Sequence, residues 1–225
     1  MHYACMFTVA LLAQKGGVGK STLVRSLAVQ AHLARAKAGI VDADPQATTA
    51  GWYPLRQERA KENKPPVAAV ATPALLRQAI DDARDDRFAW LFIDTPAGVS
   101  ELPATAAAVA DLILIPCTPS MDDMDAMGPT VKLVKASGKN AFFVVNRGRS
   151  KGINDECAVS LTSAYGLPAV ATHITNRAPI MDARPQGLVL AELDAEGKDA
   201  SITKGKDEFF ALWKWLTKQA EQRHG

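Results

Sequence analysis

Short apolar runs alternate along the chain with longer segments of helical periodicity. Several runs are apolar throughout, as expected of strands in a sheet that helices cover on both faces. This alternation is typical of βαβ units and of a parallel sheet. We predict strands at 7–13, 39–42, 67–70, 89–94, 112–116, 141–145 and 169–173. We predict helices at 20–35, 72–83, 101–109, 124–136, 155–165 and 207–223.

Two further segments carry weaker signals. The charged segment 52–66, which ends in Pro65-Pro66, is a helix or a loop, and the polar segment 195–206 is the best candidate for a loop. No repeat, low-complexity tract or linker divides the 225 residues. The length therefore fits a single α/β domain over 1–225, with a mostly parallel, twisted sheet and helices on both faces.

Composition excludes several classes of protein. The net charge of +2 is small, so any surface for nucleic acid has to be a local patch. Cys5, Cys117 and Cys157 are far apart and form no C-x-x-C pair, which argues against a disulfide framework and a zinc site. No apolar run reaches the ~18 residues of a membrane span. The N-terminus lacks the basic lead-in of a signal peptide. We expect a soluble, cytoplasmic protein.

The segment between the first strand and the first helix, K-G-G-V-G-K-S-T at 15–22, carries the most specific signal. A glycine-rich loop in this position binds phosphate, because backbone N–H groups can approach the anion and the helix N-terminus leaves such groups free. Lys20 brings charge to the β- and γ-phosphates, and the Ser21 hydroxyl suits Mg²⁺. The usual motif has glycine where this chain has Gln14, but Lys15 followed by two glycines marks a known variant.

Four further segments support the phosphate loop: D-A-D-P-Q at 42–46, L-F-I-D-T-P at 91–96, L-I-P-C-T-P at 114–119 and V-N-R at 145–147. Together they resemble the ParA/MinD family of deviant Walker-A P-loop ATPases, and more closely the small ParA proteins of plasmid partition. The resemblance extends from Phe7 to the last helix. It implies a P-loop NTPase domain that hydrolyses ATP with Mg²⁺ as cofactor.

Asp94 ends an apolar strand, where α/β sheets build their sites, and can hold Mg²⁺ together with Ser21. The resemblance implies that Asp44 positions the attacking water, and that Lys15 reaches the partner's nucleotide in an ATP-dependent homodimer. Asp42 is a structural candidate. Catalysis is thus assigned to Lys15, Lys20 and Asp44, and ATP binding to Lys15, Gly16, Gly17, Val18, Gly19, Lys20, Ser21, Thr22, Asn146 and Arg147. A solvated lysine at 15 and a turn asparagine at 146 remain the alternatives for those two positions.

ParA-like proteins bind DNA without sequence preference as ATP dimers. The resemblance therefore implies a switch ATPase, nucleoid-associated when bound to ATP, that segregates or positions plasmid or chromosomal DNA. A centromere-binding or other activator protein would be its partner, and positioning of a protein cargo is an alternative. The candidates for DNA contact are Arg177, Arg184, Lys204, Lys206, Lys214 and Lys218. Because acidic residues are interspersed among them, the alternative that these positions form an ordinary solvated surface stays open.

Three other functions compete with this interpretation. A MinD-like ATPase recruited to membranes needs an amphipathic C-terminal helix. Phe209, Trp213, Leu216 and Ala220 instead follow the spacing of a helix packed on a core, so a membrane partner is not expected. A non-catalytic nucleotide-binding module conflicts with the complete set of Lys20, Ser21, Asp44 and Asp94. An iron–sulfur reductase needs paired cysteines, which the chain lacks.

Overall fold

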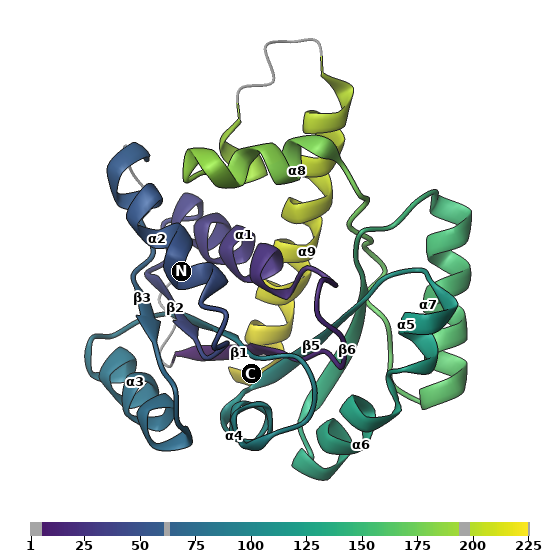
Figure 1. Cartoon of the computed structure of the whole chain (residues 1–225), viewed down its shortest axis with the longest axis horizontal. Helices are drawn as coiled ribbons and strands as arrows, with labels where there is room; N and C mark the ends of the chain where they lie inside the picture. The colour runs from purple at the N-terminus through teal and green to yellow at the C-terminus, as the bar shows by residue number, and fades with distance from the viewer. Residues whose placement is uncertain (1–5, 61–63, 194–198, 225) are drawn as a thin grey trace.

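The structure is a computed structural model that describes residues 6–60, 64–193 and 199–224. Within these ranges, six parallel strands form one sheet, in the order β3-β2-β4-β1-β5-β6. The predicted fold class, a single α/β domain with a parallel sheet, is confirmed (Figure 1). The strands are β1 (Phe7–Leu11), β2 (Ala38–Asp42), β3 (Val67–Ala69), β4 (Trp90–Asp94), β5 (Leu112–Cys117) and β6 (Asn140–Val145).

Helices cover both faces of the sheet, because successive side chains of each strand point to opposite sides. In β1, Val9 and Leu11 belong to one buried cluster, while Ala10 and the following Leu12 belong to the other. The first cluster includes residues of α1 (Lys20–Leu33), α2 (Thr48–Arg59) and α9 (Ala200–His224). The second includes residues of α3 (Pro73–Asp85), α4 (Glu101–Val109), α6 (Gly128–Ser137) and α7 (Lys151–Tyr165).

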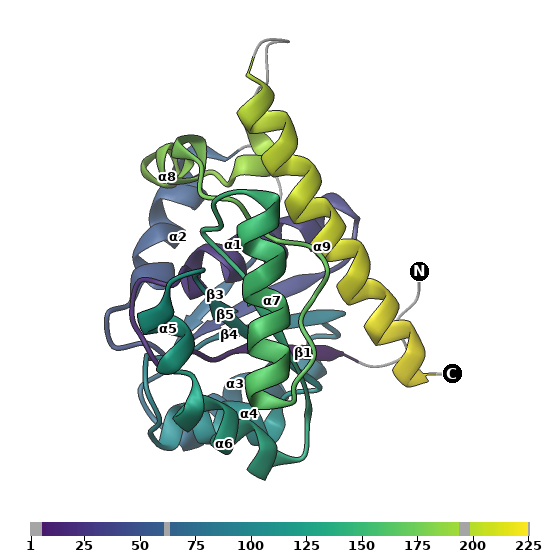
Figure 2. The ribbon, with the colours of Figure 1, turned by 90° about the vertical axis from the view of Figure 1, so that its right-hand side faces the viewer.

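The last helix packs on the core, as its spacing predicts. Phe209, Trp213 and Leu216 are buried, and the Trp213 ring lies 4.8 Å from the ring of Trp90 between centroids. Figure 2 shows α9 along one side of the molecule. The apolar stripe that a membrane-bound helix would need is therefore used inside the protein. Within the described ranges, no helix has the length and apolar character needed to cross a bilayer.

Three predicted elements are wrong in detail. Segment 169–173 makes one isolated bridge to β6, between Ala169 and Phe143, and the His173 side chain is directed to Asp155. The predicted helix 124–136 is divided into α5 (Met121–Asp125) and α6, because Pro129 starts a new helix. The predicted loop 195–206 is helical from Ala200, and 194–198 lie outside the described residues. The ambiguous segment 52–66 contains most of α2.

A segment without predicted structure lies over the carboxyl edge of the sheet. It contains α8 (Ala178–Ala183), η1 (Arg184–Gln186) and η2 (Leu190–Glu192). Arg56 of α2 donates to the Gly187 carbonyl at 3.1 Å and to both carboxylate oxygens of Glu192. Gly187 has a φ of +67°, and a Cβ there would lie 2.5 Å from the Leu55 carbonyl oxygen. The segment is thereby held tightly against α2.

Candidate functional site

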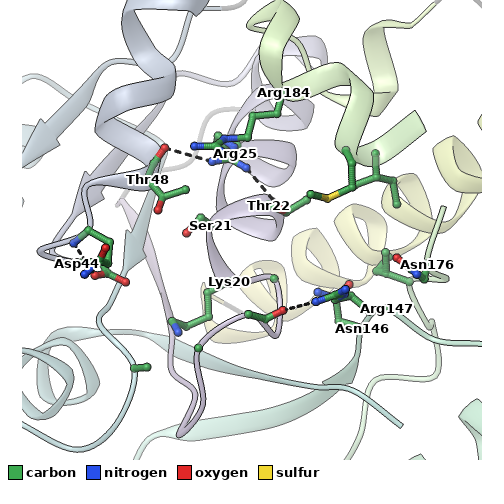
Figure 3. A pocket seen from close by; sticks show the side chains of 18 of the residues that line it. Lys20, Ser21, Thr22, Arg25, Asp44, Thr48, Asn146, Arg147, Asn176 and Arg184 are labelled. Carbon is green, nitrogen blue, oxygen red and sulfur yellow. Dashed lines mark hydrogen bonds between the residues drawn. The ribbon is translucent and has the colours of Figure 1, made fainter. Parts of the chain in front are cut away.

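The predicted site residues come together at the carboxyl edge of the sheet. Leu11, Asp42 and Asp94 pair in register across the neighbouring strands β1, β2 and β4. The loops that follow these strands therefore open on one side of the molecule, where parallel α/β sheets build their ligand sites. Figure 3 shows the resulting cleft, with residues from these loops, α1 and the segment 174–184.

The loop before α1 is shaped to surround an anion. Gly17 and Gly19 have φ angles of +81° and +90°, which side chains other than glycine rarely adopt. A Cβ at Gly19 would also collide with the Asn146 amide. The helix begins at Lys20 with no side-chain cap and no acidic residue in its first turn. Its first N–H groups are therefore available to a phosphate chain.

Lys20, Ser21 and Asp94 meet where the loop joins the helix. Lys20 is buried, and desolvation lowers the pKa of its ammonium group, although the charges of Asp94 and Asp44 oppose this shift. Asp94 is 0% exposed, and burial raises its pKa to about 6 against the stabilising effect of the Ser21 hydroxyl. Thr49 donates to Asp94 Oδ2 at 2.8 Å. Oδ1 is buried without a hydrogen-bond partner of normal geometry among the described residues.

The two aspartates that follow β2 have different environments. Asp42 is buried and accepts backbone N–H groups of Asp44, Thr49 and Ala50 at 2.7–3.1 Å. It thereby fixes the loop and the start of α2, as expected of a structural residue. Asp44 is half-buried and lines the cleft, where its carboxylate accepts from the Gln46 N–H at 2.9 Å. Asp44 is therefore the carboxylate available to a ligand, and its catalytic role stays a prediction.

Lys15 is bound within its own chain. Its Nζ donates to the Asp122 carbonyl at 2.7 Å and lies 3.3 Å from Asp123 Oδ1. Thr118 in turn donates to the other oxygen of Asp123. The short helix α5 thus holds the lysine beside the loop. Reaching a second subunit requires Lys15 to leave this carboxylate, so its predicted role across a dimer is linked to the position of α5.

Asn146 and Arg147 contact the phosphate loop directly. Asn146 donates its Nδ2 to the Val18 carbonyl at 2.7 Å, and Arg147 donates to the Gly17 carbonyl at 2.7 Å. Both side chains line the cleft. The buried donor of Asn146 supports the loop that turns at Gly19, a role the sequence did not indicate. Their contact with adenine remains a prediction.

The cleft has a volume of about 630 Å³. Of the predicted residues, it brings together Gly16, Gly17, Gly19, Lys20, Ser21, Thr22, Asp44, Asn146 and Arg147. Lys15, Val18 and Asp94 do not line it. Residues that the sequence did not assign to ATP include Arg25, Thr48, Ile174, Ile180, Met181, Arg184 and Phe209. Arg25 follows Thr22 by three positions and Ser21 by four, so helical spacing could have identified it.

The six predicted DNA contacts do not form one patch. Arg184 lines the cleft, and Arg177 lies 2.5 Å from Glu208 Oε1 in a largely buried ion pair. Lys204, Lys214 and Lys218 are exposed on α9, while Lys206 is half-buried. Of the six predicted residues, the exposed lysines of α9 are therefore the ones that a DNA backbone could contact most easily.

The two described cysteines are inside the protein. Cys117 at the end of β5 and Cys157 in α7 are both buried. Hydrogen bonding to the Cys157 thiol, together with burial, raises the pKa of Cys117. Both thiols are therefore part of the buried core. Cys5 lies outside the described residues.

The residues present fit Mg²⁺ and a nucleotide. Cation binding would satisfy the unpartnered Oδ1 of Asp94, and the Ser21 hydroxyl beside it is a suitable second oxygen ligand. The buried Lys20 and the uncapped start of α1 supply positive potential for phosphates. The volume is in the range of small-molecule sites.

Comparison with known proteins supports this assignment. The family described as the CobQ/CobB/MinD/ParA nucleotide binding domain matches residues 9–190. The maintenance of carboxysome distribution protein A of Halothiobacillus neapolitanus is 26% identical over 202 residues, 87% of this chain and 91% of the relative. The chromosome-partitioning ATPase Soj of Thermus thermophilus is 31% identical over 134 residues, 48% of this chain and 53% of the relative.

A solved structure shows the same fold. It is the septum site-determining protein MinD of Pyrococcus horikoshii, complexed with Mg-ADP. The TM-score is 0.71 at 19% identity, with 96% of this chain and 97% of that chain covered. The family match covers most of the chain, including the phosphate loop and the strand ends that carry Asp44, Asp94 and Asn146. The chain therefore belongs to the CobQ/CobB/MinD/ParA nucleotide-binding domain family.

Proposed function

We propose that the protein is a Mg²⁺-dependent ATPase that dimerises with ATP and positions a cargo on DNA. One observation carries the proposal of ATP hydrolysis. Lys20, Asp94 and the half-buried Asp44 lie close enough for their charges to interact at the mouth of the phosphate loop. A phosphate-binding lysine, a metal-binding carboxylate and a second carboxylate near the transferred group are what phosphoryl transfer to water requires.

In this proposal each residue has a separate task. The loop N–H groups and Lys20 bind the phosphates and stabilise their negative charge. Asp94 and Ser21 hold Mg²⁺, which would neutralise charge on the phosphate oxygens. Asp44 accepts a hydrogen bond from the attacking water and orients it. The half-exposed position of Asp44 leaves it accessible to such a water.

The proposed dimer is controlled through Lys15. In the isolated chain Lys15 is bound to α5 by Asp122 and Asp123. A γ-phosphate in the partner's site offers the ammonium group a stronger negative charge than one carboxylate. Nucleotide binding would therefore favour the pairing of two subunits, and loss of the γ-phosphate would favour their separation.

We propose a protein assembly as the cargo. The relative from Halothiobacillus neapolitanus, which covers most of this chain, is named for the distribution of carboxysomes. Segregation of chromosomal or plasmid DNA is the second candidate, because the Soj relative is a chromosome-partitioning ATPase. Its alignment covers less than half of this chain. Both candidates require an activator partner and a DNA surface on which the ATP dimer is retained.

DNA binding can be tested with the exposed lysines of α9. Fluorescence anisotropy with unrelated duplexes should give an affinity that rises with Mg-ATP, ignores sequence and falls with salt. The double variant Lys214→Ala/Lys218→Ala should reduce the log–log salt slope by ~0.9 for each lysine that contacts phosphate in each subunit. Lys132→Ala, an exposed lysine on α6 on the other face of the sheet, is the matched control. Binding to anionic liposomes without binding to any duplex would contradict the proposal.

A further inference from the structure

Arg25 is a buried cation that has no acidic partner within the described ranges. It lies on α1, one turn beyond Ser21, and only 4% of its surface is exposed. It donates to the Thr48 carbonyl and to the Thr22 hydroxyl, both at 3.4 Å, which is long for hydrogen bonds. Its guanidinium also lies 5.8 Å from the centroid of the Trp52 ring. Among the described residues it makes no ion pair, although Asp94 and Asp42 act on it from a greater distance.

A second guanidinium is directed toward the same point. Arg184 begins η1 and enters the cleft from the side opposite α1, so that the two side chains are neighbours in Figure 3. The segment that carries it is fixed to α2. Arg59 donates to the Pro185 carbonyl at 2.7 Å, and Gly187 lies against the backbone of α2. The approach of Arg184 to Arg25 is therefore built into the fold.

This arrangement is unfavourable without a ligand. Burial is the largest influence on the pKa of Arg25 and lowers it. The charge of Asp94 opposes this shift, and the repulsion of Arg184 adds to it, so that the pKa falls to about 10. Charged groups are buried in proteins when they are paired or bind a ligand. Two guanidinium groups at one point of a ligand cleft, with weak hydrogen bonds, indicate a place for an anion.

We propose that Arg25 and Arg184 bind the α-phosphate of the nucleotide and so form a second anion position beyond the phosphate loop. The inference rests on the proposed function. Lys20 and Ser21, with the buried Asp94 beside them, mark the end of the cleft for the β- and γ-phosphates and Mg²⁺. Arg25 lies one helical turn, about 5 Å, further along α1 and contacts the hydroxyl of Thr22. The next phosphate toward the sugar is therefore the group within its reach, and guanidinium groups bind phosphate bidentately.

The low exposure of Arg25 argues against a macromolecular ligand. A DNA backbone or an acidic peptide could reach Arg184 at the mouth of the cleft, but not the guanidinium beneath it. The pair also predicts a pattern of selectivity. Because ATP and ADP share the α-phosphate, the arginines should strengthen binding of both nucleotides equally. Lys20, in contrast, should affect ATP and ADP to different extents.

Calorimetric titration of the full chain with Mg-ADP and a non-hydrolysable Mg-ATP analogue tests this assignment. Arg25→Gln and Arg184→Gln should each weaken both nucleotides by the same factor, roughly 10-fold or more for the buried residue. The ratio of the two dissociation constants should stay constant. Arg77→Gln, an exposed arginine on α3 outside the cleft, is the matched control and should bind as the wild type does.

Thermal unfolding without nucleotide separates binding from structure. Since Arg25 is a buried charge with no ion pair in the described part of the chain, Arg25→Gln should unfold at the same temperature as the wild type or higher. Loss of stability in Arg25→Gln, together with unchanged affinity in Arg184→Gln, would assign a structural role and overturn the inference. Equal affinity of all variants and the wild type would overturn it as well. A wild-type protein that binds neither nucleotide would contradict the proposed function itself.

Discussion

The substitution Asp94→Asn tests how much the buried charge of Asp94 destabilises the fold, separately from its proposed role in binding Mg²⁺. The carboxyl group is fully buried, and its pKa of about 6 lies above the ordinary value of 3.8. The amide of asparagine has nearly the same shape. Its oxygen can still accept from Thr49, and its NH₂ group takes the position of the unpartnered Oδ1. The substitution therefore removes the negative charge and leaves the packing in place.

The sign of the effect follows from the pKa shift. A carboxyl group whose pKa is raised in the folded state binds its proton more tightly there than in the unfolded chain. The free energy of unfolding therefore falls as the pH rises from about 4 to about 6, and the full cost is present above that range. A shift of about 2 pKa units corresponds to roughly 3 kcal/mol. Asp94→Asn should recover up to that amount at about pH 7.5, equivalent to ~6–12 °C in melting temperature for a chain of this size.

Urea unfolding in EDTA between about pH 4.5 and 7.5 measures the difference between the two proteins. The advantage of Asp94→Asn should shrink as the pH falls, because the wild-type carboxyl group becomes protonated. In a parallel titration without EDTA, Mg-ADP should stabilise the wild type more than the variant. Asp85→Asn, at an exposed position of α3, should show no such pH-dependent gain. A variant less stable than the wild type at about pH 7.5, or a gap independent of pH, would refute the reasoning.

Three further variants test other parts of the site. Asp44→Ala should bind the ATP analogue normally but lose turnover, roughly 100-fold or more, because the carboxylate acts mainly in the transition state. Wild-type turnover in a steady-state phosphate assay would contradict this. Asp123→Asn weakens the hold on Lys15 and should shift ATP-dependent dimerisation to lower protein concentration in light scattering, whereas Lys15→Ala should remain monomeric. Gly187→Ala forces a side chain into a positive-φ position against Leu55, and should lower the unfolding free energy by about 1–3 kcal/mol in urea titration; an unchanged midpoint would argue against the tight contact with α2.

Local periodicity and short motifs were sufficient to predict the strands of the sheet and to identify the candidate site residues. All six strands of the sheet were expected, because each is a short apolar run next to a turn signal. The loop at 15–22 was interpreted as a phosphate loop from its glycines and lysines, and its binding of phosphate stays a prediction. Asp42 was expected to be structural, and its backbone hydrogen bonds to the start of α2 agree.

The remainder depends on tertiary contacts that one sequence does not reveal. Segment 169–173 has the composition of a strand but makes only one isolated bridge to β6, between Ala169 and Phe143. Arg184 is basic and near the C-terminus, yet it lies in the cleft because Gly187 and Arg56 fix its segment to α2. Lys15 was expected to reach outward, and its ion pair with Asp123 joins residues 108 positions apart in the chain.

The most direct test of the central claim is a calorimetric titration of the wild type and Lys20→Ala with the non-hydrolysable Mg-ATP analogue. Lys20 is the buried cation at the start of α1, beside Asp94 and Asp44. The wild type should bind one nucleotide per chain. Lys20→Ala should remain folded and lose at least ~10–100-fold in affinity, as expected for a charged hydrogen bond to phosphate. Equal affinity of the two proteins, or no binding by the wild type, would contradict the assignment of the cleft as an ATP site.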